Sequence, residues 1–119
     1  MKSFLTAIFT VISVVFFFNT ANSSDHQFVP ALVFDMGGKF DKSFNQAAYN
    51  GAEKFKKDTG IKYKEFEVTA PTQREQAIRN MAKRGAKVVI AMGFAQAAAV
   101  EKAAKEFPDT KFAIIDMVV

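Results

Sequence analysis

Hydrophobic and polar positions change their spacing several times along the chain, and each change predicts a different element. Four short runs are typical of strands, because they are apolar or alternate in polarity and end at turn residues. They are Gln27–Phe34, Ile61–Val68, Lys87–Met92 and Lys111–Ile115. The third run is apolar after its lysine, which is typical of a strand covered on both faces. Pro30 has no backbone N–H to donate, so we expect pairing of the first run to start only after it.

The segments between these runs carry apolar residues at helical spacing. The first of them places Ala48, Ala52 and Phe55 on one stripe, and the third is rich in alanine. The predicted capping boxes are Ser43 with Gln46 and Thr72 with Glu75, and the predicted helix ends are Gly60, Gly85 and Pro108. Strands and helices therefore alternate, which predicts an α/β fold with a parallel sheet and right-handed crossovers.

The first two dozen residues follow a different pattern from the rest of the chain. Lys2 precedes an apolar stretch from Phe4 to Phe18, and small residues lie before a cut after Ser23. This is the layout of a secretory signal peptide, and the stretch is short for a membrane span. We predict a signal peptide over residues 1–23 and an exported domain over 24–119. An uncleaved N-terminal anchor is the alternative. A lipoprotein would need a cysteine at the cut, so a soluble periplasmic or secreted protein is expected.

Composition narrows the possible functions. The 119 residues fit one domain, and a formal charge of +4 without a basic run argues against nucleic-acid binding. The chain contains no cysteine, which excludes disulfides, zinc–thiolate sites and a cysteine nucleophile. Its one histidine, His26, belongs to the predicted tail, and no P-loop or GxGxxG motif is present. The pattern favours binding over catalysis, and it calls for no cofactor and no metal.

Polar and glycine residues gather where the predicted strands end. Ligands of open parallel sheets bind beyond the carboxyl ends of the strands. The residues placed there are Asp35, Gly37, Gly38, Asp41, Lys42, Ser43, Phe44 and Asn45 after the first run, Gly93 and Phe94 after the third, and Asp116 after the fourth. Loops from separate parts of the sequence are thus expected to converge on one rim.

Each of these residues also has an ordinary structural role. The glycine pair can serve only a tight turn, and Ser43 is better explained as a helix cap than as a nucleophile. Phe44 can be a core residue, and the aspartates at the strand ends can cap helices. If its ring is open to solvent, Phe44 offers a platform for a flat ligand, and base–aromatic stacking contributes about 1–3 kcal/mol. Carboxylates beside it would accept hydrogen bonds from hydroxyl or N–H groups.

Two stretches of the chain resemble a known family. The motif D-x-G-G-x-x-D-K-S-F-N-Q spans Asp35 to Gln46 and is followed by A-x-x-G, from Ala48 to Gly51. The later stretch VVIAMGFAQAAAVEKAAKEFPDTKFAIID has the same order of motifs. Together they resemble the basic membrane protein family, also called PnrA-like substrate-binding proteins of ABC transporters. The resemblance covers essentially all of the chain after the predicted signal peptide.

The resemblance implies a type I periplasmic binding protein, in which two Rossmann-like lobes close on a ligand. Members of the family typically bind nucleosides, mostly purine ones, and pass them to a membrane permease, so the protein would be membrane-associated through its transporter. In this pattern Phe44 stacks on the base, while Asn45 and Asp35 form hydrogen bonds with the ligand. The full ligand-binding set that the motifs imply is Asp35, Phe44, Asn45, Gly93, Phe94 and Asp116.

Length is where the sequence departs from the family. Members are two to three times longer, whereas this chain stops just past its fourth predicted strand, so we expect the first lobe alone. One stack and two hydrogen bonds barely exceed the cost of association, about 4 kcal/mol or more. Nucleoside binding by the isolated lobe is therefore expected at millimolar strength or weaker. The alternative function is a secreted or surface interaction protein, an antigen or adhesin, without a role in transport.

Overall fold

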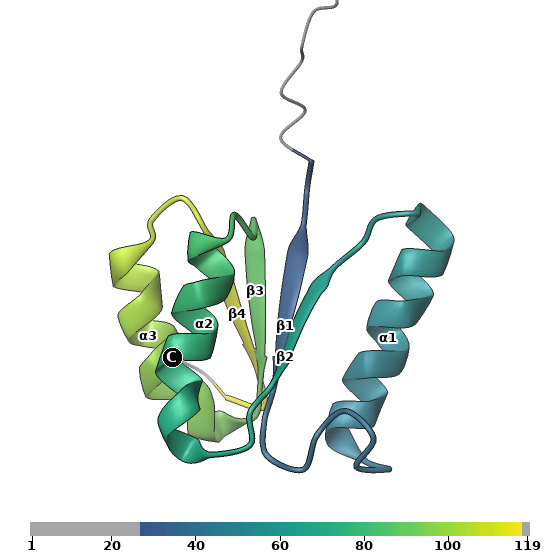
Figure 1. The fold of residues 1–119 in the computed structure, drawn as a ribbon, viewed down its shortest axis with the longest axis horizontal. Coiled ribbons are helices and arrows are strands. Elements are labelled where there is room, and N and C mark those ends of the chain that lie inside the picture. Colours follow the sequence, from purple (N-terminus) through teal and green to yellow (C-terminus); the bar gives the residue numbers. More distant parts are fainter. Residues whose placement is uncertain (1–26, 118–119) are drawn as a thin grey trace, which may run out of the picture.

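The computed structural model describes residues 27–117 and contains one parallel sheet in the strand order β2-β1-β3-β4 (Figure 1). The elements in chain order are β1 Pro30–Phe34, α1 Phe44–Thr59, β2 Lys64–Glu67, the 3₁₀ turn η1 Pro71–Gln73, α2 Arg74–Lys83, β3 Val88–Met92, the 3₁₀ turn η2 Phe94–Gln96, α3 Ala97–Glu106 and β4 Lys111–Ile115. The predicted α/β fold with a parallel sheet is confirmed. The predicted signal peptide lies outside the described residues. Within residues 27–117, no helix has the length and apolar character needed to cross a membrane.

The helices divide unequally between the two faces of the sheet. Figure 1 shows α1 alone on one side, and α2 with α3 on the other. This follows from the strand order, because the chain steps from β1 to β2 in one direction and then from β2 past β1 to β3 and β4 in the opposite direction. Right-handed crossovers in opposite directions place their helices on opposite faces. The order of the strands reverses between β1 and β3, where ligands of such sheets usually bind.

Two apolar clusters of different size hold the layers together. The larger lies between the sheet and the α2–α3 layer and includes Ala77, Ile78 and Met81. Ala82, the fourth residue of the predicted α2 stripe, is also buried, so the stripe is confirmed. The smaller lies under α1 and consists of Leu32, Phe34, Ala52 and Met92. Since α1 has to cover its face of the sheet alone, part of that face is left without a helix above it.

The strand boundaries differ slightly from those predicted. Pro30 opens β1 and is already paired in register with Val88, so pairing starts at the proline and not after it. A proline is tolerated as the first residue of a strand. The second predicted run forms a strand only over Lys64–Glu67. β4 lies at the edge of the sheet, and alternate side chains of this strand are exposed.

The predicted cap of α1 is wrong. Ser43 makes no side-chain hydrogen bond to the first turn, and its backbone dihedrals, φ −147° and ψ −122°, are not those of a regular cap. Asp41 takes its place. Its Oδ1 accepts from the backbone N–H groups of Ser43 (2.8 Å) and Gln46 (3.1 Å), and its Oδ2 accepts from that of Asn45 (3.1 Å). A carboxylate has two oxygens and so satisfies three amides, which a single hydroxyl cannot do.

The predicted pairing of Thr72 with Glu75 is also wrong. A 3₁₀ turn precedes α2, and the side chain of Gln73 accepts from the backbone N–H groups of Thr69 (2.8 Å) and Ala70 (3.2 Å). Glu75 instead forms an ion pair with Lys102, 2.8 Å away on α3. The amide side chain of Gln73 is the longer group, and it reaches back across the turn to amides that the hydroxyl of Thr72 does not approach.

Candidate functional site

Asp35 directly follows β1, and its backbone is held by a neighbouring amide side chain. Asn45 on α1 accepts from the N–H of Asp35 (3.3 Å) and donates to its carbonyl oxygen (3.2 Å). Only 2% of Asn45 is exposed. Both polar ends of this side chain thus bind the loop, and in this structure Asn45 positions Asp35 and does not present its amide to the surface.

The carboxylate of Asp35 is paired with an arginine that sequence reasoning missed. Nε and Nη2 of Arg74 both donate to Oδ1 of Asp35, each at 3.0 Å. The two side chains are each about 20% exposed, so the pair is partly desolvated. Arg74 is the first residue of α2, and its loop follows β2 at the same edge of the sheet. The rule that placed the other loops at this edge would also have placed Arg74 there.

Gly93 brings the loop after β3 against the same carboxylate. Its φ of +93° suits glycine, and a Cβ at this position would lie 3.4 Å from Oδ2 of Asp35 and 3.8 Å from Cε1 of Phe44. The structure therefore brings together Asp35, Phe44 and Gly93, which come from three separate parts of the sequence. Oδ2 of Asp35 faces this meeting point, while the ion pair with Arg74 uses Oδ1.

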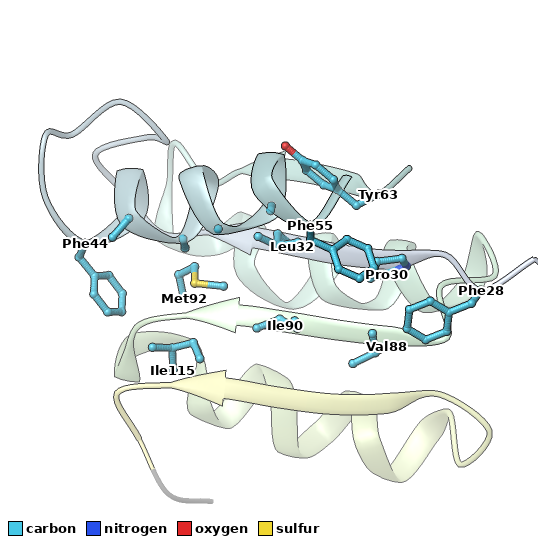
Figure 2. Close-up of a pocket in the computed structure, with 14 residues that line it drawn as sticks. Phe28, Pro30, Leu32, Phe44, Phe55, Tyr63, Val88, Ile90, Met92 and Ile115 are labelled. Carbon is cyan, nitrogen blue, oxygen red and sulfur yellow. The ribbon is translucent and has the colours of Figure 1, made fainter. Parts of the chain in front are cut away.

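Phe44, the first residue of α1, is 38% exposed. Figure 2 shows its ring extending from the helix end toward Met92 and Ile115, at the end of the groove described below. The ring lies at the carboxyl edge of the sheet and is not packed beneath its own helix. Part of the ring is therefore open to solvent.

The other two predicted positions lie at the same edge but outside this cluster. The N–H of Gly93 donates to the carbonyl of Ile115 (3.1 Å), which joins the end of β3 to the end of β4. Asp116 follows in an exposed turn with φ +72° and forms no hydrogen bond or ion pair with another residue of the range 27–117. Phe94 is 67% exposed.

The glycine loop is fastened to β2 on its outer side. Lys39 forms an ion pair with Glu65, and its backbone N–H donates to Glu67 (2.9 Å). The hydrogen bond to Glu65 raises the pKa of Lys39 despite some desolvation. The Lys39 ammonium also lies 5.1 Å from the centre of the Tyr49 ring. Both loop glycines have positive φ, as a tight turn requires, and a Cβ at Gly38 would come within 2.8 Å of the Glu67 carboxylate.

Gln96 was also missed, although it supports the rim from below. It is fully buried, and its Nε2 donates to the carbonyl oxygens of Val33 (3.0 Å) and Met92 (2.8 Å). It thus ties the ends of β1 and β3 together at the point where the strand order reverses. A glutamine in an alanine-rich helix start carries no sequence signal for such a role.

An apolar groove of about 510 Å³ lies beside α1 (Figure 2). We call it the α1 groove. It runs from Phe28 and Val88 at one end to Phe44 and Ile115 at the other, with Ile90 on its floor and Gly51 on its wall. Almost every lining atom is apolar, so the α1 groove offers a sugar no hydrogen bonds. The polar rim beside Phe44 is therefore the candidate site, and the groove is the part of the sheet that α1 leaves uncovered.

Metal binding has no support in the described part of the chain. Across residues 27–117, no group of three or more His, Cys, Asp or Glu side chains is arranged to hold an ion. The rim instead provides an aromatic ring, a carboxylate paired with a guanidinium, and backbone at Gly93. These groups suit recognition of a small organic molecule.

The chain forms an α/β lobe of the doubly wound type, with one parallel sheet and with loops at the carboxyl edge where ligands of such sheets bind. The model of the family described as "ABC transporter substrate-binding protein PnrA-like" matches residues 28–119. The chain belongs to this family, and the family resemblance of the two motif stretches is confirmed.

Individual relatives agree with this assignment. An uncharacterized lipoprotein of Pyrococcus furiosus is 37% identical over 72% of this chain and 22% of its own length. The ABC transporter nucleoside-binding protein BmpA of Lactococcus lactis is 30% identical over 75% of this chain and 26% of its own. A crystal structure of an ABC transporter solute-binding protein from Aeropyrum pernix has a TM-score of 0.72 at 26% identity, covering 77% of this chain and 25% of that one. The chain spans about a quarter of the length of these relatives.

Proposed function

We propose that this chain supplies the first-lobe half of a nucleoside site in the substrate-binding component of an ABC uptake system, with purine nucleosides favoured. The family membership supports the transporter, and the name of the Lactococcus lactis relative supports the nucleoside. In this proposal Phe44 stacks on the base, and Oδ2 of Asp35 accepts a hydrogen bond from the ligand. Asp116, Phe94 and the backbone of Gly93 border the ligand, and Asn45 acts through Asp35.

One observation carries the proposal: the partly exposed Phe44 ring and Oδ2 of Asp35 both lie beside Gly93. Stacking contributes about 1–3 kcal/mol per base, and a hydrogen bond to a charged acceptor contributes about 1.5–3 kcal/mol. Association costs about 4 kcal/mol or more. The described half site should therefore bind adenosine at millimolar strength or weaker.

The proposal includes export. With a signal peptide over residues 1–23 removed, the domain from residue 24 would act outside the inner membrane and meet a permease there. We propose neither an enzymatic reaction nor a cofactor.

The test is titration of adenosine into ¹⁵N-labelled protein, comparing Phe44→Ala with Phe40→Ala. Phe40 is a matched control, because it is an exposed ring of the same loop that packs edge-on against Tyr49, with 5.2 Å between ring centres. We expect Phe44→Ala to weaken binding about tenfold or more, as loss of one stack predicts, and Phe40→Ala to leave it within about twofold. Equal losses in the two variants would overturn the role of Phe44.

The alternative of a secreted interaction protein makes a different prediction. Adhesion to a protein or cell surface would not need an open ring beside a carboxylate. A protein that bound no nucleoside but kept its adhesion in Phe44→Ala would favour this alternative.

A further inference from the structure

We propose that Arg74 is a positioning residue that sets the charge preference of the rim, so that the site takes an uncharged hydrogen-bond donor and rejects a cation. The inference rests on the proposed nucleoside function and adds a requirement about the ligand. It starts from the contacts that fix Asp35, the one carboxylate beside the Phe44 ring in the described cluster.

Asp35 is held at three points. Asn45 fixes both its backbone N–H and its carbonyl, and Arg74 fixes its carboxylate. The two bonds from Arg74 arrive at the same oxygen, Oδ1, each at 3.0 Å. The second oxygen, Oδ2, lies beside Gly93, and the ring of Phe44 lies beside the same glycine. A ligand stacked on that ring would meet Oδ2 at its edge.

The charge of this carboxylate is already balanced. An isolated aspartate at a binding rim attracts cations, whereas a carboxylate paired with a guanidinium forms a nearly neutral unit. Because both side chains are about 80% covered, water screens the pair only partly. For a cationic ligand, repulsion by Arg74 would cancel the attraction by Asp35. A neutral hydroxyl or N–H would still donate a charge-assisted hydrogen bond to Oδ2.

Neighbouring charges do not supply the same effect. Asp41 is directed to the first-turn amides of α1, and Lys39 is paired with Glu65 on the outer side of the loop. Arg74 is the cation that touches Asp35. It therefore decides whether Asp35 offers the ligand a net negative charge or an acceptor without one.

The experiment uses two probes that differ in charge and by one methyl group on N1: adenosine, which is neutral, and 1-methyladenosine, which is a cation at neutral pH. Both are titrated by NMR into the wild type, Arg74→Gln, Arg74→Lys and Arg79→Gln. Arg79 is the matched control, because it lies on the same helix and pairs with Glu75 and Glu106 away from the rim. The measured quantity is the ratio of the two dissociation constants in each protein.

We expect the wild type to prefer adenosine, Arg74→Gln to shift the ratio toward the cation by about tenfold, and Arg74→Lys to keep most of the wild-type ratio. Arg79→Gln should keep all of it. A merely structural role would weaken both probes equally, so an unchanged ratio in Arg74→Gln would overturn the inference and leave the proposed function standing. A wild type that bound neither probe would overturn both.

Discussion

A side chain at Gly93 would contact both Asp35 and Phe44. Substituting alanine places a Cβ on a backbone with φ +93°, which is strained for any residue but glycine, and the new Cβ would lie 3.4 Å from Oδ2 of Asp35. We expect Gly93→Ala to lower the free energy of unfolding by about 1–3 kcal/mol and to weaken adenosine binding further than instability explains. Chemical denaturation and the NMR titration measure the two effects.

Gly60→Ala is the control that separates the effect of backbone strain from an effect on the candidate site. Gly60 also has positive φ, +72°, at the end of α1, but nothing lies within 4 Å of a Cβ there. This variant should lose about 1–2 kcal/mol of stability and bind adenosine like the wild type. If both variants bound adenosine equally well, Gly93 would have only a backbone role.

At the residue scale, the sequence predicts the members of the rim better than their contacts. Three residues, Asp35, Phe44 and Gly93, stand out because their types are unusual at strand ends. They also belong to the two stretches that resemble the family. Arg74 does not stand out, since its partner lies 39 residues away and no local pattern records the pair. Asn45 was predicted as a ligand contact. Only its burial between α1 and the loop shows that its amide is used by Asp35.

At the scale of elements, the start of α1 depends on Asp41. Desolvation opposes ionisation of this carboxylate, but the backbone N–H groups of Ser43, Gln46 and Asn45 outweigh it and hold the pKa of Asp41 below its ordinary value of 3.8. We expect Asp41→Ala to lower the melting temperature by several degrees at pH 6, because three first-turn amides lose their acceptor. Circular dichroism melts measure the change.

The stabilisation by Asp41 should depend on pH in a defined direction. Because the pKa of Asp41 is lower in the folded than in the unfolded state, its carboxylate stabilises the fold at pH values above 3.8, the ordinary pKa. This stabilisation is lost as the pH falls below 3.8 and through the folded-state pKa. The difference in melting temperature between wild type and Asp41→Ala should therefore be largest at pH 6 and should become smaller below pH 3.8. Asp58→Ala, which removes a surface partner of Lys54, should show almost no gap. A gap that stayed constant down to pH 2 would contradict the capping role.

Elements themselves were predictable because their signals are local. Each strand and helix was expected near its observed place, and Gly60 ends α1 in the left-handed conformation as predicted. The two predicted capping boxes were wrong for the same reason, because they too were read from local spacing. Sequence spacing favoured the residues with familiar capping patterns, whereas the folded turns brought the longer acceptors, Asp41 and Gln73, onto the amides.

At the scale of the whole molecule, one helix covers a face that needs two. Alternation of elements predicted the parallel sheet, but which face each helix takes depends on the direction of each crossover, and no residue records it. The α1 groove is the result, bounded by Ile90, Gly51 and the rings of Phe28 and Phe44. The α1 groove and the edge strand β4 together leave exposed apolar surface, which favours association with other apolar groups.

We therefore expect the folded protein to bind Nile red, an uncharged dye, in the α1 groove. Gly51→Gln should reduce the fluorescence gain severalfold, since this position opens into the groove with nothing within 4 Å of a Cβ. It should also stabilise α1 by about 0.5–1 kcal/mol, because glycine is a poor helix former. Asn50→Gln, one residue away and outside the groove, should change neither. Dye binding that Gly51→Gln left intact would place the apolar surface elsewhere.

The central claim is that the ring of residue 44 receives a planar ligand at the carboxyl edge of the sheet. Intermolecular nuclear Overhauser effects between adenosine and side-chain-labelled protein test it most directly. We predict contacts from the base protons to the ring of Phe44, with weaker ones to Gly93. Contacts confined to Phe28 and Val88 at the opposite end of the α1 groove, or to Phe40 on the outer loop, would contradict it.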